Sequence, residues 1–312
     1  MTRALLLLVV LLAPLPAAAQ GGERVLTIIS PWQLGANATI RAVADSMGRA
    51  LGQTAVVVVR DGGSGVVGMQ VLAASPADGN TVAYAAITPL VVQPHLVRGI
   101  GYRLESFASV CNVTENVLGI VVRPDSPFRG MPDLVAEARR RSLSYGSPGP
   151  NSVPQIGVEK VRAAAGGEYE HLPFRGDQQP ILEVLAGRLD FAAIVVASGG
   201  EMLKIGRLRL LGVFSSRRHP EFPDTPTMQE QGIAALQHSF AGMHAPAGTP
   251  APVLDRLEAA CRQAMTDPVF LRVAAANGVV ADFRPRAEQD RLLRELYEDF
   301  GRSLRELGVR PQ

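Results

Sequence analysis

Residues 208–232 read LRLLGVFSSRRHPEFPDTPTMQEQG, and residues 240–250 read FAGMHAPAGTP. Two earlier stretches have the same character, YGSPGPNS at 145–152 and HLPFRGDQQPILEVLAGRLD at 171–190. In these stretches short apolar segments lead into loops rich in Gly, Ser and Pro, and helical segments begin at such loops. They contain no nucleophile–base pair and no cluster of metal-ligating residues. This pattern is typical of a two-lobed binding protein rather than of an enzyme.

Residues 1–19 predict an export signal. Arg3 is the only charged residue among them, residues 4–15 are apolar, and the alanines at 17–19 fit a small-residue cleavage site. The apolar run is shorter than the roughly 20 residues that cross a bilayer. A buried N-terminal helix is the alternative interpretation. We expect a periplasmic protein without a lipid anchor, because no cysteine lies near the cleavage site.

Composition limits the partners that the chain can have. The mature part is long enough for two domains of ordinary size, and a hydrophobic content of 47% supports buried cores. A net charge of +2 gives little electrostatic attraction for nucleic acid, which we do not expect as a partner. The densest basic run, Arg139-Arg140-Arg141, lies among apolar residues at helical spacing and predicts a solvated helix face.

The chain has two cysteines, Cys111 and Cys261, separated by 150 positions in the sequence. An oxidising compartment would permit a disulfide between them. Two separate buried thiols are an equally acceptable interpretation, because sequence spacing does not show whether the residues meet.

Strand-like and helix-like segments alternate along most of the chain. The predicted strands are 24–29, 55–59, 81–86, 143–145, 169–172 and 189–196, and the predicted helices between them include 40–51, 66–74, 155–165 and 181–185. Strand–helix–strand repetition predicts parallel pairing with right-handed crossovers. We expect an α/β fold of the periplasmic-binding-protein type, with two lobes that each hold a mostly parallel sheet flanked by helices.

Two apolar segments mark the expected crossings between lobes. Residues 117–122 precede a proline-rich turn, and residues 240–244 precede another. If both cross, lobe one comprises residues 20–122 plus 243–312, and lobe two comprises residues 123–242. Two lobes joined in this way are expected to close around a solute like a hinged flytrap.

Several loops that follow predicted strands could hold a ligand. In open parallel sheets ligands lie beyond the carboxyl ends of the strands, and helix N-termini there offer unpaired N–H groups and partial positive charge. These loops therefore suit an anion such as a carboxylate. The candidate ligand-binding residues are Trp32, Gly35, Ala36, Asn37, Gly63, Ser64, Gly65, Thr88, Ser147, Pro148, Asn151, Ser152, Gly176 and Asp177.

Each candidate has a simpler structural interpretation beside the functional one. Asn37 and Ser152 could act only as N-caps of the helices that follow them. Trp32 could pack against the hinge instead of forming an aromatic wall of the site. Arg60 and Arg175 flank two of the loops, and we expect both to be surface or hinge residues.

Motifs for cofactor or hydrolytic chemistry are incomplete. Gly63 to Gly68 match the dinucleotide pattern GxGxxG, but the next predicted strand, 81–86, ends without a carboxylate for a ribose. Ser64 lacks the final glycine of a nucleophile elbow, since Val66 stands there. The five histidines show no metal-ligand spacing. We expect no cofactor, no metal and no enzymatic activity.

Six segments in register resemble the Bug-type receptors of tripartite tricarboxylate transporters. They are LGQTAVVVVRDGGSGVVG at 51–68, SPADGNTV at 75–82, the stretches at 145–152, 171–190 and 207–232, and APAGTPAPVLDRL at 245–257. The resemblance covers nearly the whole mature chain. It implies a two-lobed periplasmic fold that closes around a small, usually carboxylated solute, and a separate membrane permease as partner. We expect a monomer that binds one such solute.

The chain departs from this family in its binding loops. Asn37 stands where the family usually has Asp, and the loop before it has lost some of its glycines. Asn151 stands where Gly is usual, and Gln155 where His is usual. The neutral Asn37 removes one negative charge, which should ease binding of a carboxylate or permit a different polar group. The identity of the solute stays open, and so does a second function, a sensory receptor that presents the solute to a membrane sensor kinase.

Overall fold

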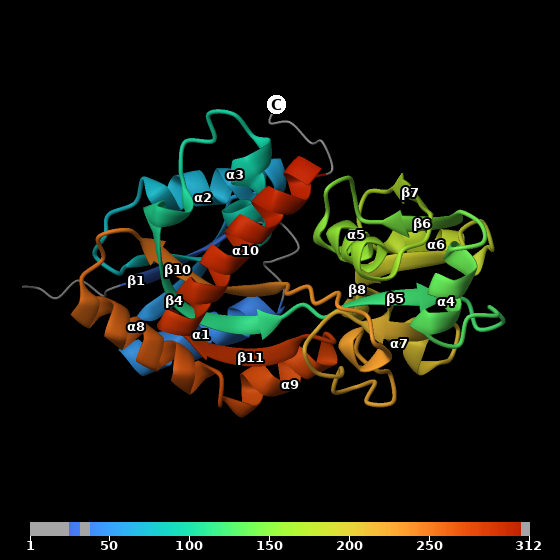
Figure 1. Ribbon diagram of the computed structural model, residues 1–312. Helices are drawn as coiled ribbons and strands as arrows, with labels where there is room; N and C mark the ends of the chain where they lie inside the picture. Colours follow the sequence, from blue (N-terminus) through green and yellow to red (C-terminus); the bar gives the residue numbers. More distant parts are fainter. Residues whose placement is uncertain (1–24, 32–37, 307–312) are drawn as a thin grey trace, which may run out of the picture.

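The computed structural model describes residues 25–31 and 38–306. Within these residues the chain forms two lobes, each a β-sheet covered by helices, which lie side by side (Figure 1). This confirms the expected α/β, two-lobed architecture. The predicted signal segment, residues 1–19, lies outside the described residues.

Lobe one contains a six-stranded sheet with the order β11-β4-β10-β3-β1-β2. Its first half alternates strand and helix as predicted. The elements are β1 (Val25–Ser30), α1 (Ala38–Leu51), β2 (Thr54–Val59), α2 (Val66–Ala73), β3 (Thr81–Ala86), α3 (Gln93–Leu96), β4 (Phe107–Glu115), β10 (Phe240–Pro246), α8 (Ala251–Ala264), α9 (Pro268–Ala276), β11 (Val280–Pro285) and α10 (Arg286–Glu306).

Lobe two contains a five-stranded sheet with the order β7-β6-β8-β5-β9. Its elements are β5 (Leu118–Val122), α4 (Met131–Ala138), β6 (Leu143–Ser147), α5 (Val153–Ala165), β7 (Tyr169–Pro173), α6 (Gln178–Leu185), β8 (Phe191–Val195), α7 (Val196–Lys204) and β9 (Arg209–Val213). The predicted strand 189–196 is real but shorter, because α7 begins at Val196.

Both sheets are mixed, which corrects the expectation of mostly parallel sheets. β1 pairs in parallel with β2 and β3, and β6 pairs in parallel with β7 and β8. β10 runs antiparallel to β3, and β5 runs antiparallel to β8. The reason is the way the chain changes lobes. β5 and β10 each enter their sheet on the side where the carboxyl ends of its parallel strands lie. They must therefore run in the opposite direction to those strands.

The two crossings lie side by side. The backbone N–H of Asn116, just after β4, donates to the carbonyl of Ser239, just before β10, at 2.7 Å. Strand β5 pairs with β8 and β9 in the second sheet, so the apolar run to Val122 is a buried strand of lobe two rather than the end of lobe one. We propose boundaries at these crossings, with lobe one as residues 25–116 plus 240–306 and lobe two as residues 117–239.

A continuous apolar core extends through the region of the crossings. One cluster of buried side chains includes Leu72 and Leu90 of lobe one, Tyr145 and Phe214 of lobe two, and Phe240 at the second crossing. Burial of this surface is the main term that favours the folded state. The shared cluster therefore couples the packing of the two lobes.

Cys111 and Cys261 form a disulfide, with their Cα atoms 6.5 Å apart. The bond joins β4, which lies between β11 and β10 in the first sheet, to helix α8, and both residues are fully buried. Of the two interpretations that the sequence left open, the structure shows the paired one.

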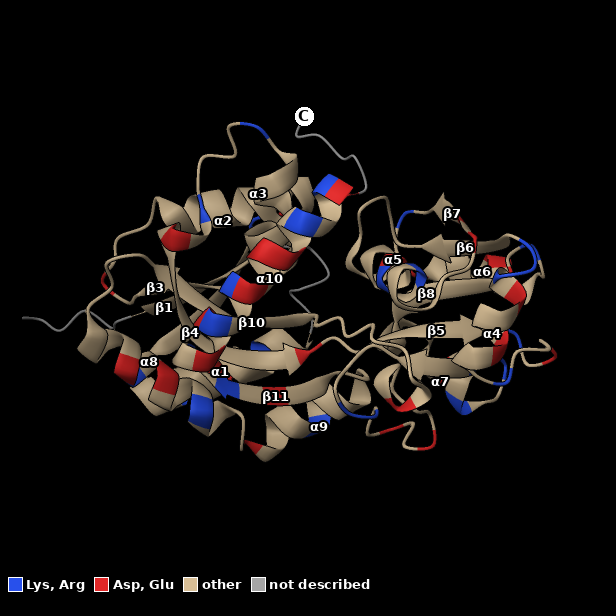
Figure 2. Ribbon diagram, in the orientation of Figure 1, with Lys and Arg blue, Asp and Glu red and all other residues tan. Residues whose placement is uncertain are grey.

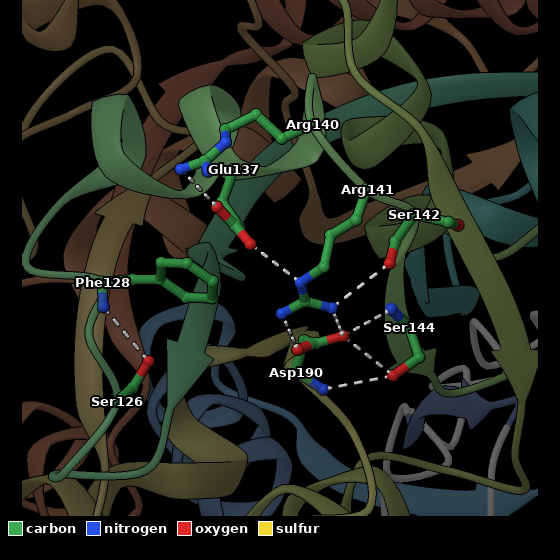
Figure 3. A network of polar contacts seen from close by, with 8 residues as sticks. All are labelled: Ser126, Phe128, Glu137, Arg140, Arg141, Ser142, Ser144 and Asp190. Atoms are coloured by element: carbon green, nitrogen blue, oxygen red, sulfur yellow. Dashed lines mark hydrogen bonds and ion pairs between the residues drawn. The ribbon is translucent and has the colours of Figure 1, made fainter.

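The basic run at 139–141 begins where α4 ends, and Arg141 belongs to a polar network (Figure 3). Its Nη2 donates to Asp190 Oδ1 at 2.7 Å and its Nε donates to Glu137 Oε1 at 2.9 Å. Asp190 Oδ2 also accepts from the backbone N–H of Ser144 at 2.8 Å. Burial acts to raise the pKa of Asp190, but the hydrogen bonds from Arg141 and Ser144 outweigh it and lower the pKa. The network fastens the amino ends of β6 and β8.

We expect removal of the disulfide to lower the free energy of unfolding by about 3–5 kcal/mol, because the bond closes a long loop in the unfolded chain. Urea unfolding of the oxidised and the reduced wild type would measure this without changing a side chain. The double variant Cys111→Ala, Cys261→Ala is the matched control, and it should be unaffected by reductant. A reduced protein as stable as the oxidised one would contradict the expectation.

Candidate functional site

The carboxyl ends of the parallel strands in both sheets point toward the crossings. Just after β3, the N–H of Ile87 donates to the carbonyl of Phe240, where the chain re-enters lobe one. Just after β8, the N–H of Val196 donates to the carbonyl of Val117, where the chain enters lobe two. Since the neighbouring strands are parallel to β3 and β8, the loops that follow them converge between the lobes. The sequence predicts a ligand site at these loops, and that assignment stays a prediction.

The first loop of lobe one cannot be compared with the prediction. Trp32, Gly35, Ala36 and Asn37 lie outside the described residues, and helix α1 begins immediately after them at Ala38. Their roles stay predictions.

The loop after β2 has an unusual backbone. Gly62, Gly63, Ser64 and Gly65 all have positive φ angles, of 132°, 55°, 56° and 93°. A Cβ atom on Gly62 would lie only 2.9 Å from the side chain of Val67. Left-handed conformations are cheap for glycine, but Ser64 bears a cost on the order of 1 kcal/mol. Such strain is concentrated at functional sites, and here it shapes the N-terminus of α2.

Thr88 follows β3 and begins a short π-helical turn, η3 (Thr88–Val92). This turn contacts the short helix η2 (Gly63–Gly65), so the loops after β2 and β3 meet. π-helical turns occur frequently at functional sites. Thr88 is half-buried at this junction.

In lobe two, Ser147 and Ser152 are joined in one cluster of side chains. Ser147 Oγ lies 3.1 Å from Ser152 Oγ and 2.7 Å from His171 Nε2, and it donates to the carbonyl of Gly149 at 3.1 Å. Ser152 is the N-cap of α5, where its Oγ accepts from the N–H of Gln155. Ser147 is fully buried, so its side chain supports the loop from behind.

His171 is a member of this cluster that the sequence did not single out. It lies in β7, directly opposite Tyr145 of β6, and the two rings contact each other with centroids 4.9 Å apart and a tilt of 32°. Burial lowers the pKa of His171, so the imidazole is neutral at pH 7. The distance between Ser147 and His171 is that of a nucleophile–base pair, but a fully buried hydroxyl cannot reach a substrate. The pair positions the loop.

Two loops of lobe two are tied together. The N–H of Gly176 donates to the carbonyl of Pro148 at 3.3 Å, and the N–H of Asn151 donates to Gln155 Oε1 at 2.5 Å. Asn151 has a φ of 57°, which asparagine tolerates better than most residues. Pro148, Asn151, Ser152 and Gly176 are therefore brought together at the N-terminus of α5.

Asp177 lies at the start of α6, but its carboxylate is engaged within the lobe. Oδ2 accepts from the hydroxyl of Ser198 at 2.8 Å, and Oδ1 accepts from the N–H of Val195 at 3.4 Å. Burial raises the pKa of Asp177 to about 6, although both hydrogen bonds act against the shift. The side chain ties α6 to the start of α7, so any contact with a ligand falls to its backbone.

On the part of the chain that the structure describes, acidic and basic side chains lie close to one another. Acidic and basic residues are interspersed on α8, on α10 and over the far end of lobe two (Figure 2). The groove beside the network of Figure 3 is lined by Arg123, Arg141 and Arg188, and each of them pairs with a carboxylate. Arg60 and Arg175, as expected, have exposed side chains.

The chain is similar to known proteins in sequence and in structure. The model of the tripartite tricarboxylate transporter family receptor matches residues 39–309. A UPF0065 protein of Bordetella pertussis is 30% identical over 278 residues, which cover 87% of this chain and 85% of the relative. The crystal structure of a TctC solute binding protein from Polaromonas superposes with a TM-score of 0.82 at 22% identity, over 91% of this chain and 98% of that one. A Rhodopseudomonas palustris protein solved with adipate superposes with a TM-score of 0.75 at 22% identity, over 92% and 98% of the two chains.

We expect acid to weaken the cluster around Ser147. Because the folded pKa of His171 lies below its unfolded value of about 6.5, the contribution of the neutral ring to stability is complete above that pH and is lost as the pH falls through the folded pKa. His171→Gln keeps a hydrogen-bonding side chain that does not titrate. Urea unfolding at pH 8 and pH 5 should therefore show a smaller loss of stability for His171→Gln than for the wild type. Equal losses would contradict this role of His171.

Proposed function

Because the chain belongs to the receptor family of tripartite tricarboxylate transporters, we propose that it captures one small carboxylated organic solute between its lobes and delivers it to a membrane permease. The family is one of solute-binding receptors and not of enzymes. The observation that carries the proposal is that α2, α5 and α6 each follow a parallel strand, β2, β6 or β7, whose carboxyl end lies on the side of its sheet where the chain changes lobes.

A carboxylate suits these helix ends for electrostatic reasons. The first N–H groups of each helix have no partner within the helix and carry part of the positive end of its dipole. In lobe two the proposed contacts are the N–H of Val153 at the start of α5, the first N–H groups of α6 and the hydroxyl of Ser152. Ser147 and His171 hold this loop in place. In lobe one we propose Gly63, Ser64, Gly65 and Thr88, with Trp32, Gly35, Ala36 and Asn37 from the loop before α1.

The proposed place of action is the periplasm. The fold is that of periplasmic binding proteins, and residues 1–19 carry the predicted export signal. The disulfide between Cys111 and Cys261 suits an oxidising compartment. Among the described residues, no helix has both the length and the apolar character that a membrane crossing requires. The monomeric state and the alternative of a sensory receptor stay predictions.

We expect a dicarboxylate to raise the melting temperature of the mature protein. Adipate is the first compound to test, because a structural neighbour was solved with it. A ligand that binds only the folded state adds about 2.7 kcal/mol of stability at a concentration one hundred times its Kd. A thermal-shift screen of mono-, di- and tricarboxylates would measure this, with adipamide and a diamine of equal length as uncharged and cationic controls. Stabilisation by the controls alone would overturn the anion proposal.

We expect Ser152→Ala to weaken binding of the best carboxylate by about 0.5–1.5 kcal/mol, because one hydrogen bond to the ligand is lost. Loss of the N-cap should also cost about 1 kcal/mol of stability. Asp267→Ala is a control that removes a cap away from the proposed site, because Asp267 accepts from the N–H of Val269 at the start of α9 and also pairs with Arg49. Calorimetric titration and melting curves separate the two effects. If both variants bind like the wild type, Ser152 serves only as a cap.

A further inference from the structure

Among the described residues, one short ion pair joins a helix of lobe one to a helix of lobe two, away from the crossings. Lys160 Nζ on α5 lies 2.6 Å from Asp299 Oδ2 on α10, and the side chains are 21% and 30% exposed. Lys160 Nζ also donates to the carbonyl of Leu236 at 3.2 Å, in the segment that leads to the second crossing. One ammonium group thus binds a helix of lobe two, a helix of lobe one and the chain between them. Figure 1 shows α5 facing α10 across the boundary of the lobes.

A second interlobe ion pair lies on the β11 side. Arg217, beyond β9, places Nη2 at 2.7 Å from Asp282 Oδ1 in β11 and at 3.8 Å from Glu115 Oε2 at the end of β4. Asp282 and Glu115 are both buried, and Glu115 directly precedes the first crossing. This pair is therefore part of the hinge itself, where a rotation of the lobes moves atoms least.

The helices that Lys160 and Asp299 connect carry the two halves of the proposed site. α10 packs against η3, which begins at Thr88. α5 begins beside Ser152, about two turns before Lys160. Any rotation that moves α5 away from α10 separates the halves of the site and breaks the ion pair. The pair can form only when the lobes have the relative orientation seen here.

We propose that Lys160 and Asp299 are positioning residues that hold the lobes in the relative orientation seen here without contacting the solute. The consequence for solute affinity rests on the proposed function, but the effect on lobe orientation does not. Partly buried ions gain more from each other than exposed ions do, since less water screens them. Loss of the pair should raise the population of separated lobes about three- to tenfold.

The orientation of the lobes can be measured in the ligand-free protein. The two cysteines of the chain are bound to each other, so introduced cysteines can be labelled specifically. Arg98→Cys in lobe one and Glu168→Cys in lobe two replace exposed side chains. Spin labels at both positions report the distribution of distances between the lobes by pulsed dipolar spectroscopy.

In this labelled background we expect Lys160→Met and Asp299→Asn each to enlarge the long-distance population about three- to tenfold. The two changes together should do no more than either alone, and the exchange Lys160→Asp with Asp299→Lys should restore the wild-type distribution. Arg291→Met is the matched control, because it breaks an ion pair with Glu295 inside α10 and should leave the distances unchanged.

An unchanged distribution in both single variants would overturn the proposal, and so would single effects that add in the double variant. Melting curves of the same variants show whether a variant has merely lost stability, which would lower the melting temperature without lengthening the distance. The distances between the labels are measured without solute. A carboxylate screen without a hit would therefore leave this proposal unaffected, and unchanged distances would leave the result of the screen unaffected.

Discussion

The hydrogen bond between Asn116 and Ser239 marks the constraint on which the structure depends, namely that the chain changes lobes twice at one place. A segment that enters a sheet at this place must run antiparallel to the parallel strands whose carboxyl ends lie there. β5 runs in this way beside β8, and β10 does so beside β3. That direction turns the carboxyl ends of both sheets toward each other. The convergence of loops from two separate lobes is thus a consequence of connectivity.

The loops at this junction are held by different kinds of contact in the two lobes. In lobe one the backbone is shaped by four successive residues of positive φ, including Ser64, and by the packing of η3 on η2. In lobe two the buried hydroxyl of Ser147 connects Ser152 to a neutral imidazole, His171. The carboxylate of Asp177 is occupied by α7. No acidic residue lies in the first turns of α2 and α5, which suits an anion there, whereas Asp177 places its carboxylate at the start of α6.

The relative position of the lobes rests on few polar contacts beside the shared apolar cluster. The buried carboxylates Glu115 and Asp282 meet Arg217 at the hinge, and Lys160 meets Asp299 between α5 and α10. A receptor that must both hold and release a solute needs lobes that are joined strongly at one line and weakly elsewhere. The ion pairs of this protein are distributed in this way, with buried carboxylates at the hinge and a partly buried pair between α5 and α10.

The sequence by itself determined the two-lobed α/β class, most strands and helices, and the loops that lie at the junction, because apolar periodicity and Gly, Ser and Pro at strand ends are local signals. Only the tertiary structure decided that Leu118–Val122 belongs to lobe two, that both sheets are mixed, and that Cys111 reaches Cys261. It also decided that His171 supports Ser147 and that Asp177 turns to α7. These are contacts between residues distant in the chain, and they depend on strand register and helix packing, which no local pattern encodes.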